Sequence, residues 1–225
     1  MTHRRRVVGT FDELLEPFSE HVNARCFART LVADFEGLAR VLAPRAEAAG
    51  GLLELSASLL RGLQGVDSGA VTTLLADVER LEALGRNPQL NALTRYRRDT
   101  RGLAFPVDVY SFHVDRAPVE ADTFLCTYAG APSEGLDSED AERLIDDPAI
   151  RAALRCHHGR DEDFDAFLTD GNFDLHFRAK AGAQPFSFGL GHLWRIAVAA
   201  PDAKAPACIH RAPPEQGRPR LMLIS

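Results

Sequence analysis

The chain has 225 residues, of which 45% are hydrophobic and 26% are charged, proportions that are typical of a globular protein. Its formal net charge of -6 offers no basic surface to a phosphate backbone, so we do not expect a nucleic-acid partner. No apolar stretch reaches the roughly 18 residues of a membrane span. The basic start of the chain is not followed by an apolar signal segment, so we expect no membrane association and a cytoplasmic location.

The four cysteines are far apart in the sequence and form no C-x-x-C pair: Cys26, Cys126, Cys156 and Cys208. In a reducing compartment, cysteines in this arrangement usually behave as small buried hydrophobes. We therefore predict free thiols.

The first hundred residues contain apolar side chains at helical spacing. This spacing predicts helices at 28–42, 52–63 and 71–81, with a shorter helix around 11–18. Pro44 is expected to end the first of these, and Asp67 or Ser68 is expected to cap the third. We therefore predict a helical N-terminal region, residues 1–100, that packs on a core formed by the rest of the chain.

From residue 101 onward, apolar and polar residues mostly alternate with a period of two. This alternation predicts strands at 107–115, 123–128, 172–178, 192–199, 207–210 and 220–224. The segment 138–169 interrupts the pattern with helical stretches and is predicted to be an insertion. The fold class is therefore α+β, with a β core in 101–225 and a helical insertion at 138–169.

His113 and Asp115 are the first candidate ligands for a metal ion. Residues two apart on a strand project from the same face, so an imidazole nitrogen and a carboxylate oxygen can reach one ion. The pair precedes the break Arg116-Ala117-Pro118, where the end of a strand would present both side chains. The alternative is a histidine with satisfied hydrogen bonds beside a solvated aspartate.

His210 is the third candidate ligand, because it closes a short apolar run and precedes a turn rich in proline. Two histidines and one carboxylate form the facial triad of non-haem Fe(II) oxygenases, with coordination positions left for a 2-oxo acid and dioxygen. Arg220 could bind the distal carboxylate of 2-oxoglutarate bidentately. Arg218 shares its strand face and is an alternative, and either residue could instead be a surface arginine.

Other polar residues receive weaker predictions. The phenol of Tyr128 could bind a co-substrate carboxylate, although a packed ring is the commoner role. His176 and His192 are predicted to be core or rim residues. The histidines of Cys156-His157-His158 point in different directions on a helix, which disfavours a second metal site.

Several of these motifs together carry a family resemblance: Asn23-x-x-x-x-x-Arg29, Phe112-His113-x-Asp115, Thr127-Tyr128-x-Gly130, His210-Arg211-x-Pro213 and Arg220-Leu221-x-Leu223. The chain resembles the bacterial family called domain of unknown function 1826, which is similar to the double-stranded β-helix superfamily of Fe(II)/2-oxoglutarate-dependent oxygenases. The resemblance implies a jelly-roll or cupin-like core, Fe(II) at His113, Asp115 and His210, and 2-oxoglutarate at Arg220. Two departures, in Gly130–Leu136 and at Ala212, concern substrate recognition more than the metal.

Three functional hypotheses follow. The first is a dioxygenase of the hydroxylase type that uses dioxygen to oxidise a small-molecule or amino-acid-like substrate, with the insertion 138–169 as a mobile cover or as a packing element. The second is a non-catalytic, cupin-like metal-binding protein for metal sensing or zinc homeostasis. The third is an interaction module in which the three ligands coincide by chance. The oligomeric state, including a homodimer, is left open.

Overall fold

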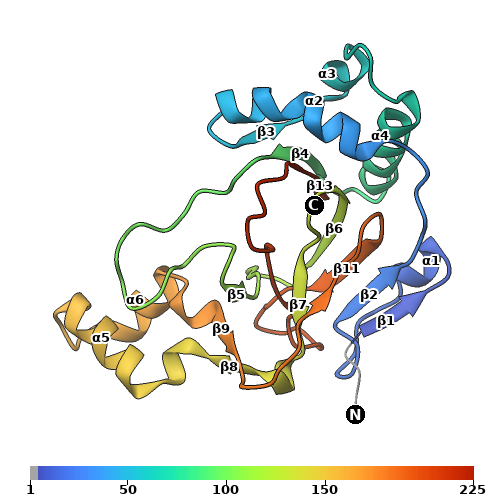
Figure 1. The fold of residues 1–225 in the computed structure, drawn as a ribbon. Coiled ribbons are helices and arrows are strands. Elements are labelled where there is room, and N and C mark those ends of the chain that lie inside the picture. The colour runs from blue at the N-terminus through green and yellow to red at the C-terminus, as the bar shows by residue number, and fades with distance from the viewer. Residues whose placement is uncertain (1–4) are drawn as a thin grey trace.

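The computed structural model describes residues 5–225, so that Met1 to Arg4, the beginning of the basic start, lie outside the described residues. The described chain has an α+β fold in which two curled β-sheets are accompanied by α-helices (Figure 1). None of the helices in residues 5–225 is both long and apolar enough to span a membrane. The predicted α+β class is therefore confirmed.

The larger sheet has seven strands in the order β1-β2-β11-β6-β13-β4-β3. Its neighbouring strands are antiparallel, apart from the parallel pair β1 and β2. Strand β6 lies at the centre and is buried along almost its whole length. The bounds are β1 (Arg5–Val8), β2 (Ala24–Phe27), β3 (Leu52–Glu54), β4 (Gln89–Leu93), β6 (Asp122–Ala129), β11 (Leu193–Ala197) and β13 (Arg220–Ile224).

The smaller sheet has six short antiparallel strands in the order β10-β7-β12-β5-β9-β8. Strand β12 lies between β5 and β7, and it therefore links the two segments that flank the long central strand β6 in the sequence. The bounds are β5 (Phe112–His113), β7 (Glu134–Leu136), β8 (Ala141–Arg143), β9 (His176–Ala179), β10 (Phe186–Ser187) and β12 (Ile209–Arg211).

Eight of these strands pair in a nested order. Strand β4 pairs with β13, β5 with β12, β6 with β11, and β7 with β10. The first strand of the series therefore meets the last, and each following pair lies inside the previous one. Successive pairs alternate between the two sheets.

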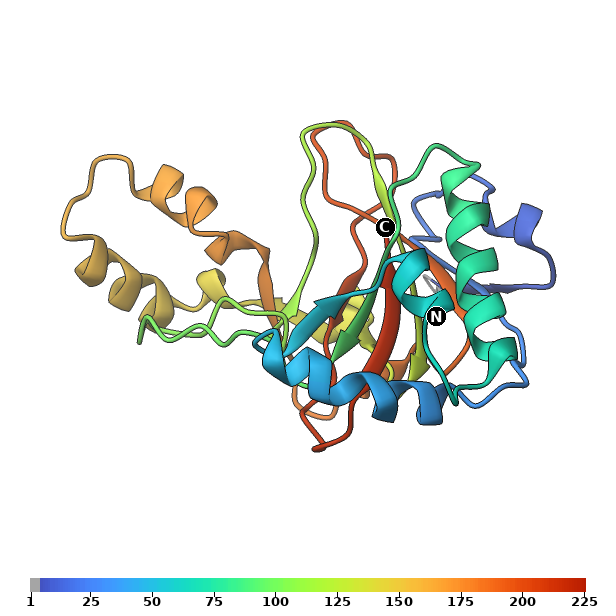
Figure 2. The same ribbon diagram turned by 90° about the horizontal axis from the view of Figure 1, so that it is seen from above.

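Helices α2 and α4 cover the outer face of the larger sheet (Figures 1 and 2). Leu42 of α2 and Leu74 of α4 share one hydrophobic core with Phe124 of β6. The Asp67 carboxylate accepts a hydrogen bond from Gly69 N at 2.7 Å and caps α4, as its sequence predicted. The helices are α1 (Phe11–Leu14), α2 (Phe35–Ala48), α3 (Ala57–Arg61), α4 (Ser68–Glu82), α5 (Pro148–His158) and α6 (Phe164–Asp170).

The first hundred residues are not entirely helical, which corrects the prediction. They contain β1 to β4 as well as four helices, and these strands join the larger sheet. The stretch 52–63 forms β3 and α3 because β3 pairs with β4. The helix predicted at 28–42 begins only at Phe35, and Pro44 lies inside it.

The segment between the paired strands β7 and β10 contains α5 and α6, which project as an arm (Figure 2). Leu154 and Phe164 of the arm form a separate small core with Phe105, from the long connection between β4 and β5. Residues 138–146 are not helical as predicted but form β8 between two 3-10 turns. The strand predicted at 107–115 is reduced to Phe112–His113.

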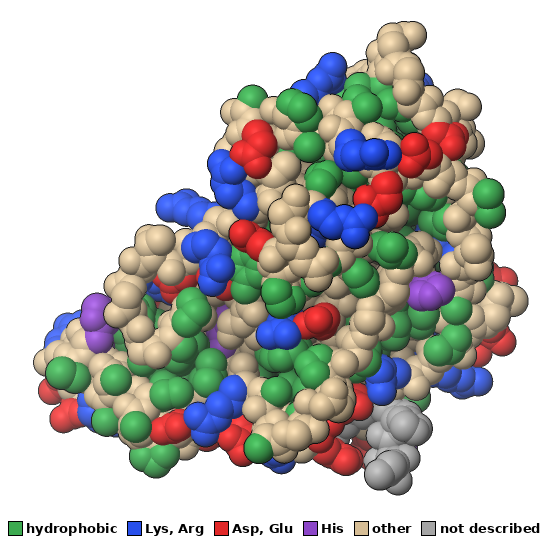
Figure 3. Space-filling model, viewed as in Figure 1, with side chains coloured by type: hydrophobic (Ala, Val, Ile, Leu, Met, Phe, Trp, Pro, Cys, Tyr) green, Lys and Arg blue, Asp and Glu red, His purple; other side chains and the backbone are tan. Residues whose placement is uncertain are grey.

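Charged side chains of both signs are interspersed over the face shown in Figure 3. The described residues of that face therefore present no continuous basic strip.

Candidate metal centre

Three side chains with metal-binding atoms meet at the smaller sheet. His113, Asp115 and His210 each offer one ligand atom, and these atoms lie within 4.8 Å of one another. His113 and His210 are directly opposite each other on β5 and β12, with ring centroids 4.6 Å apart. Asp115 Oδ1 is 4.0 Å from His113 Nε2, and Asp115 Oδ2 is 3.9 Å from His210 Nε2. The structure therefore brings together the three residues that the sequence selected as ligands.

Backbone carbonyls fix the tautomer of both histidines. His113 Nδ1 lies 2.8 Å from Ser111 O, and His210 Nδ1 lies 3.2 Å from Cys208 O. A carbonyl oxygen can only accept, so each Nδ1 carries the proton and each Nε2 presents a lone pair toward the cluster. Thr123 donates its hydroxyl to Asp115 Oδ2 at 3.0 Å, which orients the carboxylate. The donor set fits a divalent metal ion.

The electrostatics of the cluster also suit a metal. Burial, and then the neighbouring His210, lowers the pKa of His113 to about 4. A neutral imidazole is the form that binds a metal, so proton competition at His113 is weak near neutral pH. The Asp115 side chain is 35% exposed and supplies the negative charge.

A pocket of about 340 Å³ lies beside His113 and Asp115. One wall comes from residues 107–109 in the connection before β5, and another comes from the end of the arm, after α6. A small molecule in this pocket would therefore lie next to two of the three ligands.

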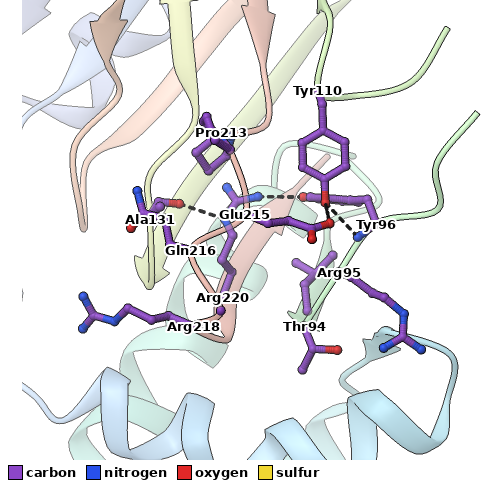
Figure 4. A pocket seen from close by; sticks show the side chains of 13 residues that line it. Thr94, Arg95, Tyr96, Tyr110, Ala131, Pro213, Glu215, Gln216, Arg218 and Arg220 are labelled. Atoms are coloured by element: carbon purple, nitrogen blue, oxygen red, sulfur yellow. Dashed lines mark hydrogen bonds between the residues drawn. The ribbon is translucent and has the colours of Figure 1, made fainter. Parts of the chain in front are cut away.

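Arg220 is a buried cation without a carboxylate partner among the described residues. It is 8% exposed. Its Nε donates to Ala131 O at 2.8 Å, and its terminal nitrogens donate to Tyr96 Oη at 3.0 Å and Ser133 Oγ at 3.2 Å (Figure 4). A guanidinium has five N–H donors, so these three bonds to neutral acceptors leave donors available for an anion.

The two candidate arginines differ in their surroundings. The Arg218 side chain is 64% exposed, pairs with Glu36 at 3.7 Å and extends away from Arg220 (Figure 4). Arg220 is connected to the histidine strands, because its partner Ser133 lies two residues before Gly135, the residue opposite His210 on β7. Arg220 is therefore the better candidate of the two for an anion.

Tyr128 does not approach the triad, which corrects its predicted role. Its hydroxyl donates to Asp77 of α4 at 2.7 Å, and its ring packs against Phe35 of α2. Burial, with Cys126 and Asp77 nearby, raises the pKa of Tyr128 well above its usual value. Side chains alternate across a strand, and on β6 Thr123 faces the triad whereas Tyr128 faces the helices.

His176 is the residue that sequence reasoning undervalued. It lies opposite His113 on β9, so His176, His113 and His210 form a row across three strands. It is 4% exposed and lines the pocket beside the triad. Burial, and then His113, lowers its pKa to about 4. No local signal distinguished His176, because its position depends on the pairing of β5 with β9.

The other histidine candidates remain outside the centre. His192 Nδ1 accepts a hydrogen bond from Arg29 N at 3.1 Å, in a different part of the fold. His158 stacks on Phe167 within the arm. Among the described residues, Cys156, His157 and His158 belong to no group that could hold a metal ion.

Comparisons with protein-family models, with curated proteins and with solved structures found no match to this chain. The resemblance to domain of unknown function 1826 therefore stays a prediction. Support for a function comes from the side chains of the centre and from the order of the strands.

Proposed function

We propose that this chain is a non-haem Fe(II)/2-oxoglutarate-dependent dioxygenase that hydroxylates a small-molecule or amino-acid-like substrate. The observation that carries the proposal is the convergence of His113, Asp115 and His210, whose ligand atoms lie within 4.8 Å of one another, with both Nε2 atoms left free by the Nδ1 hydrogen bonds. Two histidines and one carboxylate with open positions are typical of this class. When bound, iron and 2-oxoglutarate would supply the activation of dioxygen, with 2-oxoglutarate oxidised to succinate and carbon dioxide.

The nested strand order supports the proposal. An eight-stranded jelly roll forms when one long hairpin of four strand pairs is rolled up so that successive pairs alternate between two sheets. The pairs β4/β13, β5/β12, β6/β11 and β7/β10 follow this order. In a cupin-like core of this kind, ligands from β5 and β12 lie side by side on the smaller sheet, as His113 and His210 do.

Arg220 favours an oxygenase over a protein that only binds metal. Burying a guanidinium without a counter-ion is costly, so the position of the Arg220 guanidinium beside Tyr96 and Ser133 calls for an anionic ligand. A dicarboxylate such as 2-oxoglutarate would use one end at the metal and the other at Arg220. A metal sensor or a zinc-handling protein needs the triad alone.

The chain's own side chains would divide the work. Ser111 O and Cys208 O hold the histidine rings, and Thr123 holds Asp115. The pocket beside His113 would place a substrate next to the metal. Because that pocket and Arg220 are built on different elements, substrate and co-substrate would approach from different sides.

The test is an anaerobic titration of the Fe(II)-loaded protein with 2-oxoglutarate, monitored through the weak visible charge-transfer band of the chelate. We expect a saturable band with 2-oxoglutarate and none with succinate, which lacks the 2-oxo group. Stoichiometric Fe(II) binding without a band would reject the oxygenase and favour metal sensing or zinc homeostasis.

The matched variants are Arg220→Lys and Arg218→Lys. Because a lysine cannot reproduce the bidentate fork, Arg220→Lys should weaken 2-oxoglutarate binding roughly tenfold or more while sparing Fe(II). Arg218→Lys, at an exposed position, should change neither. Equal affinity in the wild type and in Arg220→Lys, measured by calorimetry, would remove Arg220 from the co-substrate site.

A further inference from the structure

We infer that His176 is the substrate-binding residue of the pocket beside the triad, where it forms a hydrogen bond to a neutral polar group of the substrate. This inference rests on the proposed function. It assigns the substrate class: a molecule with an apolar body that carries an uncharged amide or hydroxyl group.

The first step is the unmatched polarity of His176. Its side chain is almost fully buried, and neither ring nitrogen has a hydrogen-bond partner among the described residues: Nδ1 is enclosed, which leaves Nε2 as the nitrogen available to the pocket. Its neighbours on either side are the ring of Phe105, at a centroid distance of 5.9 Å, and the ring of His113, at 5.7 Å. Buried polar groups are normally satisfied, so an imidazole whose accessible Nε2 has no protein partner in a pocket wall indicates a ligand that supplies one.

The second step is the position of the residue. His176 is directly opposite His113 in the β5–β9 pair. A substrate group that is hydrogen-bonded to His176 therefore lies about one inter-strand distance from a candidate metal ligand. It is not itself a ligand in this arrangement, because the cluster of converging donor atoms contains only His113, Asp115 and His210 among the described residues. His176 is therefore placed to hold a substrate, rather than the metal.

The third step is the chemistry of the other walls. Val107, Val109 and Leu175 make the pocket apolar on several sides. The charges nearby are already paired, since Arg116 forms an ion pair with Asp174. Asp108 accepts hydrogen bonds from the backbone of Asp99 and Tyr110. Apart from Asp115, which belongs to the candidate metal centre, a charged substrate would thus meet no free counter-charge among the described residues of the pocket wall, whereas a neutral amide or hydroxyl would find a donor or an acceptor at His176.

The test uses isobutyramide as the probe, which joins a branched apolar body to one neutral amide. Saturation-transfer NMR on the full chain measures its binding with and without Mn(II), and broadening of its methyl signals by Mn(II) at the triad reports its distance from the metal. We expect saturable binding to the wild type with selective methyl broadening.

Three variants separate the role of His176 from packing. His176→Phe fills the same space without a hydrogen bond and should weaken isobutyramide binding about tenfold. His176→Gln should restore most of it. His157→Phe, at an exposed position on α5, should leave it unchanged. Undiminished binding in a folded His176→Phe, or no binding to the wild type, would overturn the inference.

These outcomes are independent of the oxygenase assignment. Saturation transfer to isobutyramide requires neither Fe(II) nor 2-oxoglutarate, whereas the charge-transfer titration requires both and does not require His176. A chelate band in His176→Phe together with unchanged isobutyramide binding would reject the role of His176 and leave the oxygenase intact. Loss of isobutyramide binding in His176→Phe, together with no chelate band in the wild type, would support the role of His176 and reject the oxygenase.

Discussion

Two polar clusters lie on opposite sides of the central strand β6 and use their charges in contrasting ways. On the helix side, Arg29 binds both carboxylate oxygens of Asp77 and donates its Nε to Gly191 O at 2.7 Å, while Tyr128 donates to the same carboxylate. On the other side, Nε2 of His113 and Nε2 of His210 have no such partner among the described residues and lie 4.0 and 3.9 Å from the Asp115 carboxylate. One cluster is closed, and the other is open.

The difference shows how a folded chain separates stability from binding. Burial lowers the pKa of Arg29, but its bonds to Asp77 outweigh burial and the pKa is raised, so the closed cluster stays charged and holds α4 to the sheet. Burial lowers the pKa of His113, and the hydrogen bond to Ser111 and the charge of Asp115 do not offset this effect, which keeps its nitrogen available. A closed network stabilises the fold, whereas an open set of donors can bind a ligand.

The largest expected effect comes from removing any one donor of the open cluster. His113→Ala, Asp115→Ala and His210→Ala should each abolish stoichiometric Fe(II) binding, because three ligands are needed together. Their far-UV spectra should remain those of the folded protein, since each variant loses few side-chain hydrogen bonds: one from either histidine to a nearby carbonyl, or one from Thr123 to Asp115. Metal analysis after desalting provides the measurement, with His157→Ala as the control. Full iron occupancy in any two of the three variants would reject the metal centre.

Disrupting the closed cluster should instead lower the stability of the fold and leave Fe(II) binding intact. Asp77→Ala leaves the Arg29 guanidinium buried and unpaired, so we expect a loss of about 3–5 kcal/mol in the free energy of unfolding, with Fe(II) still bound by the folded fraction. The double variant Arg29→Met/Asp77→Leu should recover much of that loss. Denaturant titration measures both. A loss below about 1 kcal/mol in Asp77→Ala would contradict the structural role.

The sequence predicts best what local signals determine. Helix α4 was predicted from its apolar stripe and the Asp67 cap, both of which lie within the helix or next to it. The three candidate metal ligands were identifiable because each ends or follows an apolar run and the donor chemistry of the set is specific. Strand β2 was not predicted, because it forms by pairing with β11 from the far end of the chain.

The features that local signals could not predict depended on long-range packing. Tyr128 was assigned to the co-substrate, but only the tertiary structure shows which face of β6 meets the helices. His176 is buried, as predicted for a core or rim residue, but its place beside His113 was not predicted, because the arm separates the two in the sequence and only the pairing of β5 with β9 brings them together. A strand pattern gives the alternation of faces and does not give the partner of either face.

The small core of the arm provides a third test. Leu154 is fully buried in a small core formed mainly by the arm itself, so Leu154→Ala should cost about 2–5 kcal/mol locally. Hydrogen exchange should accelerate within α5 and α6 and remain unchanged in β6 and β13. If the predicted cover role of 138–169 is correct, Fe(II) binding will persist while 2-oxoglutarate decay becomes uncoupled from substrate oxidation. Loss of Fe(II) binding would instead favour a packing role for the arm.

The smallest expected effect uses the cysteines as reporters of the same two clusters. Burial raises the pKa of Cys26, Cys126 and Cys208 to about 12, whereas Cys156 is exposed on α5, so one thiol per native chain should react rapidly with a thiol-specific reagent. Cys156→Ser should remove that rapid phase, and denaturant should release the buried thiols.

Cys126 then distinguishes the clusters, because its sulfur lies 3.7 Å from the Arg29 guanidinium. Asp77→Ala should open the closed cluster and accelerate the reaction of Cys126, while His113→Ala should leave its rate unchanged. Equal rates in the two variants would mean that the Arg29–Asp77 pair does not hold α4 against the sheet.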